Sequence, residues 1–227
     1  MSQKITRLDS RRPARIIGMN HRSVTGKVAI GGISIPFESS LERDFLIMLD
    51  FDPMVVDVFE QPVRITYESD EGRERFYTPD YLVGYDNGER VIYEVKYRAN
   101  LKDEWSKLKP KFRAALRYSK LNDMKFKIIT DAEIRGTSYL ANAKFLRTYR
   151  DQTPNFSIEE HLVRTLAILG ETTPEKLLIA AYWTLENRMK AMASLWRLVA
   201  IRRVHVDLRG PLTMASSIWV TAGEGFV

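Results

Sequence analysis

Hydrophobic and polar residues alternate in four short stretches of the first half of the chain, and each stretch predicts a β-strand. The four stretches are 55–58, 63–67, 76–85 and 90–97. Alternation sends successive side chains to opposite faces, so each strand can pack one face against a core. Asn87 and Gly88 lie between the last two stretches, and this pair is typical of a hairpin turn.

A helical repeat comes before these strands. Leu41, Phe45 and Leu49 recur every four residues, which predicts a helix with one apolar face. Ser39 precedes the repeat and is typical of a helix N-cap.

The strands are followed by one more helix and one more strand. The segment 109–123 predicts a basic helix that begins at Pro110, and 124–130 predicts a strand. The apolar stretch 28–36 is interpreted as a single strand. The predicted core therefore has the order α-β-β-β-α-β, which places the chain in the α/β class.

The pattern changes near residues 149–157. Beyond this point 157–169 and 173–200 are helical in pattern, and Thr173 followed by Pro174 is a helix start signal. Two short strand-like stretches joined by a turn then end the chain, and helices followed by such a ribbon predict a small winged-helix-type domain. The predicted domains are a basic N-terminal arm at 1–26, the α/β domain at 27–145 and the winged-helix-type domain at 146–227.

Composition narrows the function. The 227 residues carry a formal net charge of +6 and a pI of about 9.4, which favours polyanionic partners, nucleic acid first. There is no cysteine, so disulfides, thiol catalysis and cysteine-ligated metals are excluded, and a reducing cytoplasm is expected. No apolar run approaches the length of a membrane span, so no membrane association is expected.

The predicted hairpin carries charges that its folding does not require. Glu94 and Lys96 are two residues apart and therefore point to the same face. The face of Asp80 depends on the turn, because a two-residue loop would set it opposite Val95, on the wrong face. A three-residue loop with a left-handed Gly88 sets Asp80 opposite Glu94, with Cβ atoms about 5 Å apart.

Two facing carboxylates repel each other, and a hard divalent cation relieves that repulsion. Asp80 and Glu94 therefore predict a site for Mg²⁺ or Mn²⁺, with water completing the shell. Lys96 beside it would activate the attacking water or stabilise charge on a phosphate, and the sequence leaves both roles open. The alternative is an exposed strand in which all three residues are structural, but the preceding Pro-Asp and the apolar strands favour the site.

Glu42 is the candidate fourth member, an acid on the helix before the sheet. It has a second interpretation, because Ser39 and Glu42 have the spacing of a capping box, in which the glutamate stabilises the helix start. The sequence pattern does not distinguish a metal ligand from a cap here.

Three segments in this order resemble the TnsA family, the endonuclease subunit of heteromeric transposases. They are FESSLERDFLIMLDFDPMVVDVFEQPVRITY, FYTPDYLV and VIYEVKYRANL, within residues 37–135. The resemblance implies a restriction-endonuclease-like fold, a divalent metal, and catalytic roles for Glu42, Asp80, Glu94 and Lys96. It also implies cutting of the 5′ strands at transposon ends. The implied partners are DNA, a TnsB-like transposase that processes the 3′ strands and a TnsC-like ATPase, in the cytoplasm of a bacterium.

A run of cations follows the proposed site from Arg98 onward. Lys102, Lys107 and Lys111 are the candidates for contact with the DNA backbone; the alternative is a solvated amphipathic helix. Two other functions stay open: a free-standing restriction or repair endonuclease of the same fold, and a non-catalytic winged-helix DNA-binding adaptor.

Overall fold

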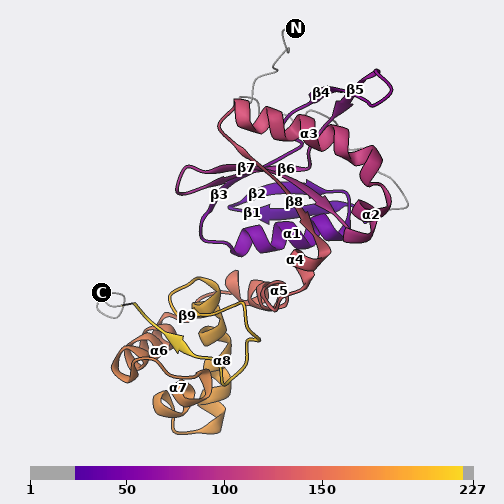
Figure 1. Cartoon of the computed structure of the whole chain (residues 1–227). Helices are drawn as coiled ribbons and strands as arrows, with labels where there is room; N and C mark the ends of the chain where they lie inside the picture. Colours follow the sequence, from indigo (N-terminus) through magenta and orange to yellow (C-terminus); the bar gives the residue numbers. More distant parts are fainter. Residues whose placement is uncertain (1–23, 222–227) are drawn as a thin grey trace. The chain divides into compact units, whose positions relative to one another are not determined.

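The computed structural model describes residues 24–221. The chain forms two compact units, and the boundary between them in the sequence follows Gly136. The first unit holds a mixed sheet of four strands in the order β3-β6-β7-β8 (Figure 1). These strands are β3 (Val55–Glu60), β6 (Tyr81–Tyr85), β7 (Arg90–Lys96) and β8 (Lys125–Thr130). β8 runs parallel to β7, and the other neighbours are antiparallel.

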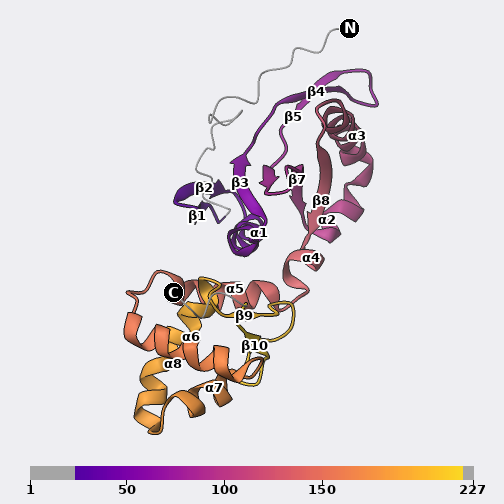
Figure 2. The same ribbon diagram turned by 90° about the vertical axis from the view of Figure 1, so that its left-hand side faces the viewer.

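A helix covers each face of this sheet (Figures 1 and 2). On one face is α1 (Ser40–Phe51), whose Phe45 ring packs 6.1 Å from Tyr81 and 5.0 Å from Tyr93 between ring centroids. On the other is α3 (Trp105–Leu121), whose Phe112 joins Leu82 and Ile92 in a buried cluster. Neighbouring residues of β6 and β7 thus alternate between the two helices, as a strand buried on both faces requires.

The β6–β7 turn is the three-residue kind. The Tyr85 N–H donates to the Glu89 carbonyl at 2.9 Å, and the Gly88 N–H donates to the Tyr85 carbonyl at 2.9 Å. Gly88 has a φ of +81°, a conformation that glycine adopts without steric cost. The register expected from a left-handed Gly88 is therefore confirmed.

Two hairpins extend the first unit, and both differ from the predicted strands. The stretch 28–36 is not one strand, because the chain reverses at Gly31 and Gly32, which have φ values of +55° and +81°. It forms β1 (Gly26–Ile30) paired with β2 (Ile33–Phe37).

The predicted strand 76–85 is also two strands. Pro79, which lacks an N–H for a strand ladder, lies between β5 and β6. β5 (Glu74–Tyr77) pairs with β4 (Ile65–Glu68), whereas β6 joins the central sheet.

Besides α3, two short helices of the first unit follow strands of the sheet: α2 (Arg98–Asp103) after β7 and α4 (Asp131–Arg135) after β8. The prediction that Pro110 begins the basic helix is wrong, because α3 begins at Trp105 and contains Pro110. Leu108 and Phe112, on either side of the proline, are both buried against the sheet. Packing on this face therefore outweighs the backbone hydrogen bond that a proline removes.

The second unit contains four helices and a short ribbon within the described residues. They are α5 (Tyr139–Arg150), α6 (Phe156–Leu169), α7 (Pro174–Ala181), α8 (Leu185–Ala200), β9 (His205–Val206) and β10 (Ile218–Trp219). A single bridge joins Thr172, between α6 and α7, to Ile218. The predicted helix 173–200 is two helices, with Thr184 capping the second.

The division after Gly136 comes earlier than the predicted boundary at 145, because α5 packs on α8 and so belongs to the second unit. The predicted basic arm, 1–26, lies outside the described residues up to 23, and β1 begins at Gly26. Among residues 24–221, no helix has the length and apolar character that a membrane span requires.

The mixed sheet between α1 and α3 agrees with the predicted α/β class and is compatible with an endonuclease-like core.

Candidate functional site

The register of β6 and β7 brings Asp80 and Glu94 to one end and one face of the sheet. Tyr81 pairs with Tyr93, so one further residue on each strand sets Asp80 opposite Glu94. Both lie on the face covered by α3, because each is two residues from a strand residue in the α3 cluster. The facing arrangement of the two carboxylates that the sequence predicted is therefore present.

Asp80 lies half-buried at the entrance to β6. Its Oδ2 accepts a hydrogen bond from the Val95 N–H at 2.7 Å, and no other described donor reaches the carboxylate. Burial raises the pKa of Asp80 well above its ordinary value, and the charge of Glu94 raises it further, while Lys96 and the Val95 N–H act in the opposite direction. A cation placed here would therefore relieve an unfavourable negative charge.

The Asp80 backbone is held by a strained neighbour. The Gln61 N–H donates to the Asp80 carbonyl at 2.8 Å, and Gln61 has a φ of +42°, which is uncommon for a residue other than glycine. Gln61 directly follows β3, whose last residue, Glu60, pairs with Tyr81 at the start of β6. The strain is thus located at the strand ends that carry the acidic residues.

Glu94 is buried, with a relative exposure of 1%. Its Oε2 accepts a hydrogen bond from the Tyr77 hydroxyl at 2.6 Å, and its Oε1 accepts one from the Lys111 ammonium at 3.0 Å. The Lys96 ammonium lies 3.4 Å from the same Oε1. A buried carboxylate needs such partners, because an unpaired one carries a large desolvation cost.

Lys96 follows Glu94 on the same face and reaches toward both acids. Burial alone would lower its pKa, but the charges of Glu94 and Asp80 outweigh burial, so the pKa of Lys96 is raised. The ammonium is therefore charged at neutral pH, which favours stabilisation of a phosphate over removal of a proton from water.

Glu42 lies in the first turn of α1, the helix on the opposite face from Glu94. Its Oε1 accepts a hydrogen bond from the Ser39 hydroxyl at 2.9 Å. Its Oε2 accepts bonds from the Glu38 N–H at 2.8 Å and the Tyr81 hydroxyl at 3.3 Å. The Ser39 hydroxyl in turn accepts from the Glu42 N–H at 3.1 Å. The carboxylate thus stabilises the helix start, as the capping interpretation expected.

The predicted convergence of Glu42 with Asp80 and Glu94 is not found as a direct cluster. Within residues 24–221, no three histidine or carboxylate side chains are grouped so that they could hold a metal ion. The physical reason is that α1 and α3 cover opposite faces of the sheet. Glu42 acts on the site through its charge instead. Burial raises the pKa of Asp80 most, the charge of Glu94 raises it further, and the charge of Glu42 makes a smaller contribution in the same direction.

Asp44, two residues after Glu42 on α1, is buried, with a relative exposure of 2%. Its Oδ2 accepts a hydrogen bond from Arg135 Nε at 2.8 Å, and its Oδ1 accepts one from Arg43 at 3.0 Å. Arg135 lies on α4, so this pair fastens α1 to the helix that follows β8.

The three lysines predicted to contact DNA have different environments. Lys102 and Lys107 are exposed on α2 and α3. The side chain of Lys111 is only 18% exposed, and its ammonium is paired with Glu94. Lys111 therefore belongs to the acidic site in this structure.

The partners of Glu94 were not predicted from the sequence. Tyr77 comes from β5, outside the central sheet, and its hydroxyl donates to Glu94. A signal existed for Lys111, since Leu108, Lys111 and Ala115 have helical spacing and the two apolar residues are buried. The basic character of the segment concealed that one of its lysines faces the sheet.

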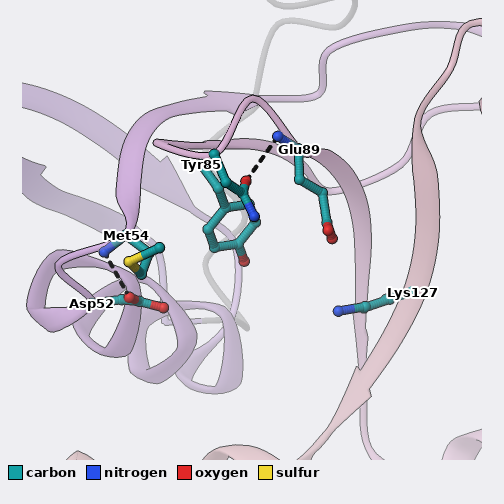
Figure 3. A pocket seen from close by; sticks show the side chains of 6 residues that line it. Asp52, Met54, Tyr85, Glu89 and Lys127 are labelled. Carbon is teal, nitrogen blue, oxygen red and sulfur yellow. Dashed lines mark hydrogen bonds between the residues drawn. The ribbon is translucent and has the colours of Figure 1, made fainter.

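A small cavity of about 240 Å³ lies at the other end of the hairpin, beside the β6–β7 turn (Figure 3). It is lined by Asp52, Met54, Tyr85, Asn87, Glu89 and Lys127. None of the predicted site residues lines it, so the cavity is not the acidic site.

Comparison with known proteins places the acidic site inside a known domain. Residues 52–131 match the family model described as TnsA-like endonuclease N terminal. The matched segment contains Asp80, Glu94 and Lys96, whereas Glu42 precedes it. No curated protein matches the chain. Over this segment the chain is therefore similar to the N-terminal domain of TnsA-like endonucleases.

Proposed function

We propose that this protein is a divalent-metal-dependent DNA endonuclease of a transposon, and that Asp80, Glu94 and Lys96 carry the reaction. One observation supports the proposal most strongly: Asp80 faces Glu94, and Lys96 lies 3.4 Å from Glu94, inside the segment that matches a TnsA-like endonuclease domain. The family match supports the nuclease activity. The geometry supports the choice of residues.

The residues present fit a magnesium ion by their chemistry. Mg²⁺ is usually bound through one or two carboxylates, with water and substrate phosphate completing the shell, so a pair of acids suffices. Asp80 has an oxygen that no described donor reaches, and its raised pKa reflects the charge of Glu94 after burial. Asp80 and Glu94 would hold Mg²⁺ or Mn²⁺. The ion would polarise a phosphate oxygen and activate water for attack.

The chain's own residues then have separate tasks. The Val95 N–H orients the Asp80 carboxylate, and Tyr77 orients that of Glu94. Lys96, charged and 32% exposed in its side chain, is placed to stabilise negative charge on the phosphate that is cut. Glu42, on α1, adds a negative charge that acts on Asp80.

The finer biological role rests on the resemblance. We propose that the protein cuts the 5′ strands at transposon ends while a TnsB-like transposase processes the 3′ strands, under a TnsC-like ATPase. A single carboxylate–lysine site positions one attack, so one copy cuts one strand at a time. The exposed Lys102 and Lys107 would contact the DNA backbone.

The second unit supports a winged-helix-type assignment. Its order is helix α6, a bridging residue at Thr172, helices α7 and α8, and the ribbon β9–β10, with Ile218 joined to both Thr172 and Val206. A small sheet beside three helices is the arrangement expected of a winged helix.

The test compares the protein alone with the protein and its transposase, each with Mg²⁺ or EDTA. Nicking of transposon-end DNA is expected with Mg²⁺ and transposase, and it should be lost in Asp80→Asn and in Lys96→Met. Vigorous nicking by the protein alone on plasmid without transposon ends would favour a free-standing nuclease. Metal-dependent cutting that persists in Asp80→Asn would overturn the assigned site.

A further inference from the structure

The buried carboxylate Glu94 already has two positive partners. The Lys111 ammonium lies 3.0 Å and the Lys96 ammonium 3.4 Å from the same oxygen, Oε1. Tyr77 occupies the other oxygen. Both oxygens of Glu94 therefore have a partner before any metal binds.

The charges of this cluster nearly balance without a metal. Asp80 and Glu94 are acidic and Lys96 and Lys111 are basic, so these four side chains sum to zero when all are ionised, and Glu42 adds one negative charge from α1, less than a divalent ion would offset. A divalent ion added between the two acids would leave the cluster with an excess of positive charge in a place of low solvent access. Such an excess is costly where charges are poorly solvated, so binding is favoured when one ammonium withdraws.

Lys111 is the lysine whose ammonium can move away from Glu94. Lys96 lies on the strand that carries Glu94, and its charge is assigned above to the phosphate, whereas Lys111 belongs to α3 and has no such task. Its ammonium lies over the Tyr77 ring, 4.6 Å from the centroid, and 5.1 Å from that of Phe112. A lysine has a flexible four-carbon stem and a compact charge, so it can leave a carboxylate without moving the helix.

We propose that Lys111 is an internal counter-ion of Glu94, which stabilises the metal-free site and which a divalent cation must displace from Oε1. This inference rests on the proposed metal-dependent function. It makes Lys111 a positioning residue, and it links the metal site to the basic helix α3, from which Lys111 comes.

The test measures metal binding and metal-free stability, neither of which needs DNA cleavage. Mn²⁺ is titrated calorimetrically into the wild type, Lys111→Met and the control Lys109→Met, which removes an exposed charge from the same helix. Lys111→Met keeps an unbranched stem and loses only the charge. It should bind Mn²⁺ at least about tenfold more tightly than the wild type, while Lys109→Met should bind as the wild type does.

Thermal unfolding in EDTA gives the second measurement. Lys111→Met should melt several degrees lower than the wild type, because buried Glu94 loses a partner. Lys111→Arg keeps the charge and should restore both the melting temperature and the wild-type Mn²⁺ affinity. If Lys111→Met does not fold, Lys111→Gln replaces it, and the same two shifts are expected.

The possible failures are distinguishable. If the wild type and Lys111→Met bind Mn²⁺ equally, and Asp80→Asn abolishes that binding, the metal site stands and the counter-ion role is wrong. If Asp80→Asn binds as the wild type does, or if no variant binds Mn²⁺, the proposed metal site itself is wrong and the inference falls with it. An unchanged melting temperature in Lys111→Met also overturns the inference.

Discussion

Replacing Glu42 by glutamine separates its role at the helix start from its role beside the acidic site. The carboxylate accepts hydrogen bonds from the Ser39 hydroxyl, the Glu38 N–H and the Tyr81 hydroxyl. Its charge also contributes to the raised pKa of Asp80, after burial and Glu94. Glutamine has nearly the same shape but no charge, so it changes the second role more than the first.

The cost in stability follows from these contacts. The glutamine carbonyl can keep the bonds from Glu38 and Tyr81 on one oxygen. Its amide can donate to the Ser39 hydroxyl, which then accepts. The number of bonds is preserved, but they are no longer charge-assisted, which roughly halves their strength. With a typical net worth near 1 kcal/mol each, the expected loss in free energy of unfolding is about 1–2 kcal/mol.

The effect on cleavage should be larger than this loss. The charge of Glu42 acts on Asp80 and on Lys96, so its removal changes the charge balance in which the metal and phosphate would bind. We expect Glu42→Gln to nick transposon-end DNA at least about tenfold more slowly, equivalent to about 1.4 kcal/mol. Urea unfolding and a single-turnover nicking assay with the partner transposase measure the two quantities on the same preparations.

Ser39→Ala is the matched control. It removes the N-cap hydroxyl that accepts from the Glu42 N–H, at a cost of about 1 kcal/mol, and it keeps the carboxylate. It should therefore be destabilised to a similar extent and still cut normally. Equal loss of cutting in both variants, or normal cutting by Glu42→Gln, would show that Glu42 is only a cap.

Three further predictions concern other parts of the chain. The pKa of Glu133 is lowered by its hydrogen bond from Thr130, so its contribution to stability is present above the unfolded pKa, about 4.3, and is lost as the pH falls below that value. Glu133→Gln should therefore flatten the decline in unfolding free energy below about pH 4.5, and a decline as steep as that of the wild type in urea unfolding would contradict this. Glu159 is buried, and both of its oxygens accept from Arg197 at 3.0 Å, so Glu159→Ala should lower the free energy of unfolding by about 3 kcal/mol in urea titrations, and a loss below about 1 kcal/mol would show that the pair is unimportant. Lys107→Ala should weaken DNA binding at low salt and reduce the slope of log affinity against log salt by about 1, and an unchanged slope would remove Lys107 from the DNA contacts.

The chain's local patterns determined much of the site. The alternation in β7 places Glu94 and Lys96 on one face, and the left-handed Gly88 sets the register that brings Asp80 opposite Glu94. These features depend on residues close together in sequence, since strand period and turn geometry are local properties. The helix start at Ser39 was predictable for the same reason.

Long-range packing decided the rest. The burial of Asp44 depends on Arg135, and the partners of Glu94 come from β5 and α3. The position of Glu42 on the other face depends on which side of the sheet α1 covers. None of these is set by local periodicity, because each requires two elements to meet in space. The sequence by itself determined which residues are candidates for the chemistry and how Asp80, Glu94 and Lys96 face one another. Only the tertiary structure decided that Glu42 lies on the other face of the sheet and which cations neutralise Glu94.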